Sequence, residues 1–406
     1  MQIRKKRILA NIYKIFLGMF GFSILGQYIL LDVLQLPFSL VEIFFIPIIW
    51  IKRKSLFIAV KRLNRLSFKQ IVLYFLLLFG FLYGTFATFD FWIILSYRSI
   101  IYMIIGFVYM QKQETSCQLS DIWLVSLSAI IGETIYVVII STSSIVSSTN
   151  VIAIALAIFT AFMLERYIMA LGTIALSLFL TINTGFRIGI VIVVVCTIEM
   201  LLFTLIRKDR KNKIISRIRR GFFLLILIII LIILLNNYEQ IVNIIADLTG
   251  MSTFAVFRTT ERMRELLSFN ISASQDTGRL DISMYAIQRL PQIFPRGLIG
   301  ESIGEYWLYI DNPLVYLYDL FGSIATIGIL VWLVMLIINN LNNYILYSKI
   351  PIKLLCIWMI PVLLILFVVN GSFMVIVYQA IETGLILGIL SNKNLKVKEL
   401  FNNNSM

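Results

Sequence analysis

Six arginines and no lysine lie in one long polar segment, residues 239–312, together with nine carboxylates. The arginines are Arg258, Arg262, Arg264, Arg279, Arg289 and Arg296. A guanidinium group is planar, stays charged and grips a phosphate through two parallel hydrogen bonds, whereas a lysine ammonium is a point charge. The exclusive use of arginine therefore predicts a site for a phosphate or pyrophosphate group. For each single arginine, the alternative is an ion pair with a nearby carboxylate.

Two further arginines lie within apolar stretches of the chain. Arg98 falls about two turns into one apolar run, where a charged side chain is costly and usually faces a cavity or a partner. Asp90 and Glu133 are predicted at comparable depth, so a structural ion pair is the alternative to a ligand site. Arg187 follows Asn183, Thr184 and Gly185, residues that interrupt a helix. Irregular backbone inside a membrane is tolerated where it lines a wet cavity, which favours a binding role for Arg187.

The sequence also excludes several kinds of chemistry. It contains no histidine, so no imidazole can act as a base or as a metal ligand. The three cysteines, Cys117, Cys196 and Cys356, lie far apart and have no metal-ligand spacing. No cluster of carboxylates suggests a metal site either. We therefore expect neither a metal nor an organic cofactor.

The elements that position these residues are transmembrane helices. Of 406 residues, 60% are hydrophobic and 14% are charged, and the mean hydropathy is +0.94, which excludes a soluble enzyme. Two apolar runs occupy the region before residue 51. Ten more cover 70–89, 91–110, 119–140, 150–165, 167–183, 187–206, 221–238, 314–338, 352–370 and 372–390. These runs predict an all-α polytopic protein with about twelve spans. The two short runs, 150–165 and 167–183, are alternatively one bent hairpin within the membrane.

The distribution of basic residues predicts the orientation of these spans. Lysine and arginine cluster at residues 4–7, 52–69 and 207–220, and Lys353 and the C-terminal lysines fall on the same side in a twelve-span count. The positive-inside rule makes this side cytoplasmic. The prediction is a multi-pass protein of a bacterial inner membrane with both termini in the cytoplasm. Contact with anionic lipid headgroups is an additional interpretation of the same clusters.

The predicted domain order follows from these spans. Residues 1–238 hold spans 1–9, residues 239–312 form an extracytoplasmic loop, residues 313–391 hold spans 10–12, and 392–406 form a cytoplasmic tail. In the loop, apolar residues recur with helical spacing over 254–267 and again over 281–290. Trp307 and Tyr309 suit a membrane interface. We expect a helical cap that lies on the outer leaflet.

Three short motifs follow one another along the chain. The first is the turn at Asn183 to Arg187. The second is Thr277-Gly278-Arg279-Leu280, followed by Pro295-Arg296-Gly297. The third is Asp311-Asn312-Pro313, followed by Asp319-Leu320. In this order they resemble the O-antigen polymerase and ligase superfamily of bacterial surface-polysaccharide assembly. The likeness covers roughly residues 150–340, and it implies a fold similar to the membrane glycosyltransferases called GT-C.

The resemblance also implies roles for individual residues. Arg187 and Arg279 stand where the family binds the pyrophosphate of an undecaprenyl-linked donor. Arg289 and Gly300 fit an Arg-x10-Gly pattern of the polymerases, and Arg98 is a further candidate for pyrophosphate. Ligases carry a histidine where this chain has Asp311, which favours a Wzy-type polymerase over a ligase. Asp311 is the first candidate for the catalytic base, with Glu301 and Glu305 behind it.

The expected function is a metal-independent glycosyltransferase that polymerises O-antigen or capsule repeat units on the outer face of the membrane, in lipopolysaccharide or other polysaccharide biosynthesis. Its partners would be undecaprenyl-pyrophosphate-linked donor and acceptor oligosaccharides, membrane lipid, and a chain-length regulator protein as an optional further partner, but no nucleic acid. A lipid-linked oligosaccharide flippase is the alternative from another class, and a ligase is the alternative within the family. Two features argue against a transporter: the two halves of the chain show no internal repeat, and the external segment is long.

Overall fold

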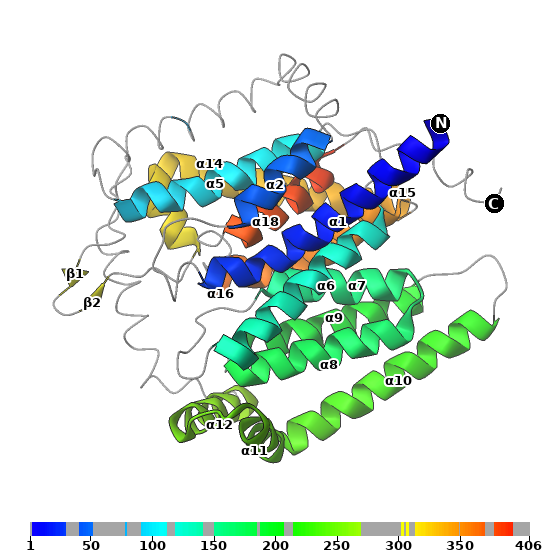
Figure 1. Ribbon diagram of the computed structural model, residues 1–406, viewed down its shortest axis with the longest axis vertical. Helices are drawn as coiled ribbons and strands as arrows, with labels where there is room; N and C mark the ends of the chain where they lie inside the picture. The colour runs from blue at the N-terminus through cyan, green and yellow to red at the C-terminus, as the bar shows by residue number, and fades with distance from the viewer. Residues whose placement is uncertain are drawn as a thin grey trace. The chain divides into compact units, whose positions relative to one another are not determined.

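The computed structural model (Figure 1) is described over part of the chain. The described residues are 2–29, 40–51, 78, 91–111, 118–140, 150–184, 187–206, 214–268, 302–303, 306–307, 313–348, 350–369 and 377–392. The chain divides into two compact units. Unit 1 holds Met1–Ile51 and Cys117–Ile271, and unit 2 holds Lys52–Ser116 and Ser272–Met406. Each unit is described by itself.

Unit 1 consists of helices. In chain order they are α1 (Gln2–Tyr28), α2 (Leu40–Ile51), α6 (Leu119–Ile135) continued by the π-helical turn η2 (Tyr136–Ile140), α7 (Val151–Met163), α8 (Tyr167–Thr184), α9 (Arg187–Ile206), α10 (Ile214–Asn236), α11 (Tyr238–Thr249) and α12 (Thr253–Ser268). Helix α1 packs on α2 and α6, and α10 packs on α9. Helices α11 and α12 form a short hairpin beyond the end of α10 (Figure 1).

Helix α7 forms the centre of unit 1. Its residues from Val151 to Phe162 are all buried, and it packs on α6, α8 and α9. A helix that is apolar on every side is expected in such a position. At 1.5 Å per residue its 13 residues extend about 20 Å, short of a bilayer core of about 30 Å. A tight turn after Met163 leads into α8, so the two short apolar runs form a helical hairpin.

A buried carboxylate holds the beginning of α7. Both oxygens of Glu133 on α6 accept the backbone amide of Asn150, each at 3.1 Å. The Asn150 side chain then accepts the amide of Ala153 at 3.1 Å and caps the helix. The backbone donors at a helix N-terminus have no partners within the helix, and a negative charge there is favourable. Glu133 therefore stabilises the N-terminus of α7 through these hydrogen bonds.

Where the structure describes unit 2, it is helical apart from one small hairpin. Its elements are α5 (Phe91–Gln111), β1 (Ser302–Ile303), β2 (Tyr306–Trp307), α14 (Pro313–Asn342), α15 (Tyr344–Tyr347), α16 (Pro351–Val369) and α18 (Val377–Ser391). Strands β1 and β2 pair antiparallel, with Ser302 opposite Trp307 and Ile303 opposite Tyr306. Trp307, predicted as a residue of the membrane interface, lies in strand β2. The chain of α14 is kinked at Gly322, which has φ 78°.

Helices α5 and α18 run side by side in the same direction. Gly384 lies so close to Met103 that a Cβ at this position would collide with the Met103 carbonyl oxygen. Further along both helices, the Asn392 side chain donates to the Met110 carbonyl oxygen at 3.0 Å. Residue numbers at the contacts increase in the same direction along both helices, so α5 and α18 are parallel. The twelve-span topology requires the same direction, since both segments are predicted to run from outside to inside.

A cluster of polar side chains closes the C-terminal end of α18. Lys353 is fully buried, and its Nζ donates to the carbonyl oxygens of Leu390 at 3.1 Å and Asn392 at 2.6 Å. The Asn340 side chain donates to the same Leu390 oxygen at 3.1 Å. Lys353 also lies over the Tyr347 ring, 4.1 Å from its centroid. A cation is stabilised at a helix C-terminus, so Lys353 has a packing role as well as its predicted topological one.

Three described helices are long and apolar enough to cross a membrane: Leu119–Val138, Tyr167–Thr184 and Phe321–Asn342. The pair Gly221–Asn236 and Tyr238–Thr249 qualifies together but is bent by 84°. Shorter apolar helices, such as Val151–Met163 and Pro351–Phe367, accompany them. These helices are compatible with an all-α, multi-pass membrane protein. The number of twelve spans and the orientation of the termini stay predictions.

Candidate binding site beside the α8–α9 turn

The turn between α8 and α9 carries the first of the three motifs. Helix α8 ends at Thr184, and α9 begins at Arg187. The buried Thr184 hydroxyl lies within hydrogen-bond distance of two carbonyl oxygens of its own helix, 3.0 Å from Leu180 and 3.3 Å from Thr181. A threonine that bonds back to the preceding turn often bends a helix. This local geometry stabilises the last turn of α8.

The α11–α12 hairpin lies against this turn. The Thr249 hydroxyl, at the end of α11, lies 3.3 Å from the accepting side-chain oxygen of Asn183. Helix α11 also packs on α8, and α12 packs on both α8 and α9. The hairpin buries Val242, Ile245 and Ala246 of α11. The structure therefore joins two segments that are 66 residues apart in the sequence, one of which leads directly into Arg187.

Gly250 makes the sharp connection between α11 and α12. It has φ 67° and caps α11, with its amide donating to the carbonyl oxygen of Ala246. This left-handed conformation is open to glycine without steric cost. Helix α12 then begins at Thr253, close beside the helix that precedes it. The position of the second helix thus depends on one glycine.

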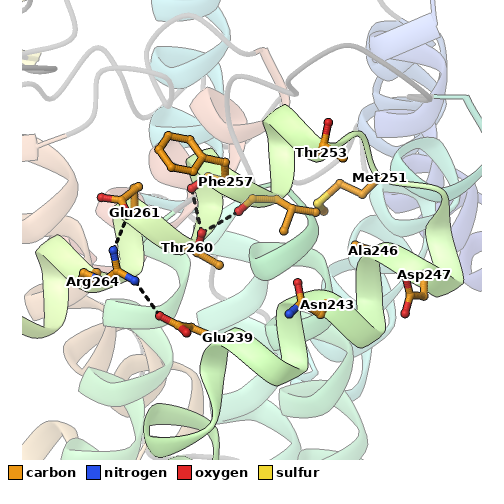
Figure 2. Close-up of a pocket in the computed structure, with 11 residues that line it drawn as sticks. Glu239, Asn243, Ala246, Asp247, Met251, Thr253, Phe257, Thr260, Glu261 and Arg264 are labelled. Atoms are coloured by element: carbon orange, nitrogen blue, oxygen red, sulfur yellow. Dashed lines mark hydrogen bonds and ion pairs between the residues drawn. The ribbon is translucent and has the colours of Figure 1, made fainter.

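A pocket of about 810 Å³ lies along the hairpin (Figure 2). Both helices and the turn that joins them line it: Glu239, Asn243, Ala246, Asp247, Met251, Thr253, Val256, Phe257, Thr260, Glu261 and Arg264. The volume falls within the range of about 300–1,000 Å³ that is common for small-ligand sites. The lining combines carboxylates, an amide and hydroxyls with an aromatic ring, that of Phe257, which is 60% exposed.

Arg264 links the two helices across this pocket. Its guanidinium donates to Glu239 on α11 at 3.0 Å and to Glu261 one turn earlier on α12 (Figure 2). The Tyr238 hydroxyl donates to the same Glu239 oxygen at 3.0 Å. Hydrogen bonds from Tyr238 and Arg264 lower the pKa of the Glu239 carboxyl, and the bond to Glu239 is the main cause that raises the pKa of Arg264. Glu239 is therefore a carboxylate at neutral pH, and Arg264 already has two anionic partners.

The described part of the chain includes two of the predicted site residues, one in each unit. Arg187 begins α9 in unit 1, beside the hairpin, although its side chain lies outside the description. Arg98 lies on α5 in unit 2 and is partly buried. Arg279, Arg289, Glu301, Glu305 and Asp311 lie outside the described residues. Their roles stay predictions.

Sequence reasoning names Arg264 among the six arginines of the polar segment but does not predict the pocket that it lines. Glu261 and Arg264 are three residues apart, a spacing that places side chains together on a helix. The sequence alone therefore indicates the contact between Glu261 and Arg264. The contact of Arg264 with Glu239 spans 25 residues and depends on the fold, so no local pattern indicates it. For this arginine the alternative of pairing with nearby carboxylates is the observed arrangement.

Within the described residues, no group of three or more Cys, Asp or Glu side chains is placed to hold a metal ion. Comparisons with known proteins add no assignment, since no protein-family model, no curated protein and no solved structure matches this chain. The geometry of unit 1 and the motifs of the sequence are thus the basis for a functional conclusion.

Proposed function

We propose that this protein is a membrane glycosyltransferase that polymerises a surface polysaccharide from lipid-linked repeat units, an O-antigen or capsule polymerase. The observation that supports the proposal is the hydrogen bond between the α11–α12 hairpin, which carries the pocket, and Asn183 at the end of α8, four residues before Arg187. A polymerase needs a site for an anionic leaving group next to a site for a sugar chain. The hairpin is hydrogen-bonded to Asn183 of the first motif, which supports placing the two proposed sites next to each other.

In the proposed reaction, a hydroxyl of the lipid-linked acceptor attacks the anomeric carbon of the donor glycan. The bond from that carbon to the undecaprenyl pyrophosphate oxygen breaks, and the lipid pyrophosphate leaves. Negative charge grows on the leaving group, and prearranged guanidinium groups stabilise it. Arg187 and Arg279 are proposed for this role, with Arg289 and Arg98 as further candidates. The leaving pyrophosphate needs no proton.

The acceptor hydroxyl loses a proton as the new bond forms. A carboxylate within hydrogen-bond reach can take that proton, which typically contributes about 10²–10⁴-fold to the rate. Asp311 is the first candidate for this base, and Glu301 and Glu305 follow. We expect Asp311→Asn to lower the rate of polymer formation by about 100-fold or more, because the amide keeps the shape but accepts no proton. Full activity in this variant would move the search to the two glutamates.

The decisive experiment compares the lipid-linked glycans of a strain that lacks this chain with those of its parent. A polymerase predicts loss of the polymer ladder while single repeat units are still displayed outside. A flippase predicts repeat units that accumulate on the cytoplasmic side. Re-expression of the chain should restore the ladder, and purified protein with a defined lipid-linked repeat should form polymer without other proteins. Trapped repeat units in the deletion strain would refute the proposal.

A further inference from the structure

The α11–α12 pocket has a net negative lining. It contains the three carboxylates of Glu239, Asp247 and Glu261 against the single guanidinium of Arg264. Arg264 already donates to two of these carboxylates. Hydrogen bonding keeps Glu239 ionised at neutral pH. A phosphate, pyrophosphate or uronate entering this pocket would meet like charges, so an anionic ligand is disfavoured here.

The same lining suits a neutral or cationic ligand that is rich in hydroxyls. Asp247 and Asn243 lie one turn apart on α11, and both side chains are exposed. Hydrogen bonds that a hydroxyl or ammonium donates to a carboxylate are stronger than neutral ones. Phe257 and Met251 add apolar surface, on which the non-polar face of a sugar ring can pack. Carboxylates, an amide and an aromatic side chain together match the alternating polar edges and apolar faces of a sugar.

The position of the pocket assigns its ligand to one part of the substrate. The hairpin is hydrogen-bonded to Asn183, four residues before Arg187, so the acidic lining begins near the turn proposed for pyrophosphate. We infer that the α11–α12 pocket binds the sugar portion of the lipid-linked glycan and selects neutral or amino sugars over sugars that carry acidic groups. This inference rests on the proposed function and extends it to the class of sugar that the site accepts.

Binding of lipid-free trisaccharides to the purified full-length protein tests this inference. The probes are a neutral N-acetylglucosamine trimer, its de-acetylated cationic form, and an anionic galacturonic acid trimer. Saturation-transfer NMR and calorimetry measure binding. We expect the neutral and cationic trimers to bind at millimolar concentration and the anionic trimer to bind at least about tenfold more weakly, the size of one hydrogen bond to a charged group.

Two variants with the same change in net charge separate the pocket from the rest of the surface. Asp247→Asn removes one negative charge from the lining, and Gln240→Lys adds one positive charge at an exposed position of α11 outside it. Asp247→Asn should weaken the cationic trimer by about tenfold, whereas Gln240→Lys should leave it unchanged. Equal binding of the anionic trimer, equal effects of both variants, or no binding of any probe would overturn the inference.

The outcome is independent of the test for polymerisation. If the deletion strain loses its polymer but the trimers do not bind the pocket, the function stands and the sugar selection falls. If repeat units are trapped inside while the trimers bind as expected, the polymerase proposal falls, and the pocket remains a sugar site of a different protein class.

Discussion

Gly250 offers a test of the hairpin in which backbone conformation is separated from packing. Its φ is 67°, and a Cβ built at this position meets no atom within 4 Å. A substitution therefore adds no steric clash with neighbours, and its cost arises from the left-handed conformation. That cost is about 1–2 kcal/mol for a residue with a Cβ. Alanine recovers about 0.4–1 kcal/mol by restricting the unfolded chain, so Gly250→Ala should destabilise the hairpin by about 1 kcal/mol.

The expected effects of three substitutions differ in a defined order. Valine is branched at Cβ and should cost the most, about 2 kcal/mol, whereas asparagine tolerates the left-handed region and should cost the least. Because 1–2 kcal/mol corresponds to about 5–30-fold in an equilibrium, hydrogen exchange of the α11 and α12 amides should accelerate about fivefold in Gly250→Ala and up to about 30-fold in Gly250→Val. Trisaccharide binding should weaken in the same order.

Gly172 provides the matched control. It lies within α8, and a Cβ built there also meets nothing within 4 Å, but its backbone is helical. Alanine is favoured over glycine in a helix by about 0.5–1 kcal/mol, so Gly172→Ala should leave exchange in the hairpin unchanged. Equal exchange in Gly250→Val and the parent protein, or faster hairpin exchange in Gly172→Ala, would refute the role assigned to the Gly250 turn.

Three further predictions concern single charged groups. Arg187→Lys should remove most of the polymerase activity, since a point charge loses the bidentate fork, while Arg166→Lys should not; equal activity in both would reduce Arg187 to an anchor. The pKa of Glu239 is lower in the folded chain than its usual value of 4.5. The ion pair of Glu239 therefore stabilises the hairpin at pH values above 4.5, and this stabilisation is lost as the pH falls through the pKa of the folded state. An acid titration of hairpin exchange should show this step, and Glu239→Gln should abolish it. Lys353→Met should lower the unfolding free energy in micelles by about 3 kcal/mol, since a charged donor to two carbonyl oxygens is lost; Lys353→Arg should cost less, and no change in the methionine variant would contradict the packing role.

The sequence predicts several elements of unit 1 because their signals are local. The helix that periodicity indicates over 254–267 is present as α12, and the two short apolar runs at 150–165 and 167–183 are the α7–α8 hairpin. Helix α11 is not among the predicted elements, because the predicted polar segment begins at Glu239. Its apolar residues Val242, Ile245 and Ala246 recur with helical spacing, and a glycine follows its last turn, so a signal was present.

Other features depend on contacts between distant parts of the chain. From the sequence, Lys353 is one more basic residue near a predicted membrane boundary. Its burial depends on the packing of α14 and α16 against the end of α18. The sequence makes Glu133 a candidate partner for an intramembrane arginine, and it gives no sign that this carboxylate also accepts the backbone amide of Asn150, the residue that caps α7. Composition and periodicity predict which segments are helical and apolar. They do not predict which polar group satisfies which helix end.

The 84° bend between α10 and α11 has a consequence for how the protein responds to its bilayer. A helix that spans the membrane adjusts its tilt to the thickness of the hydrocarbon layer. In the predicted topology α10 crosses the membrane, and α11 leaves it nearly at a right angle after the single residue Asn237. A tilt of α10 together with the helices packed on the hairpin then becomes a rise or fall of the hairpin relative to the lipid headgroups. For a helix about 18 Å long, a tilt of about 10° lifts its far end by about 3 Å. Acyl-chain length is thus expected to tune how far the pocket stands from the membrane surface.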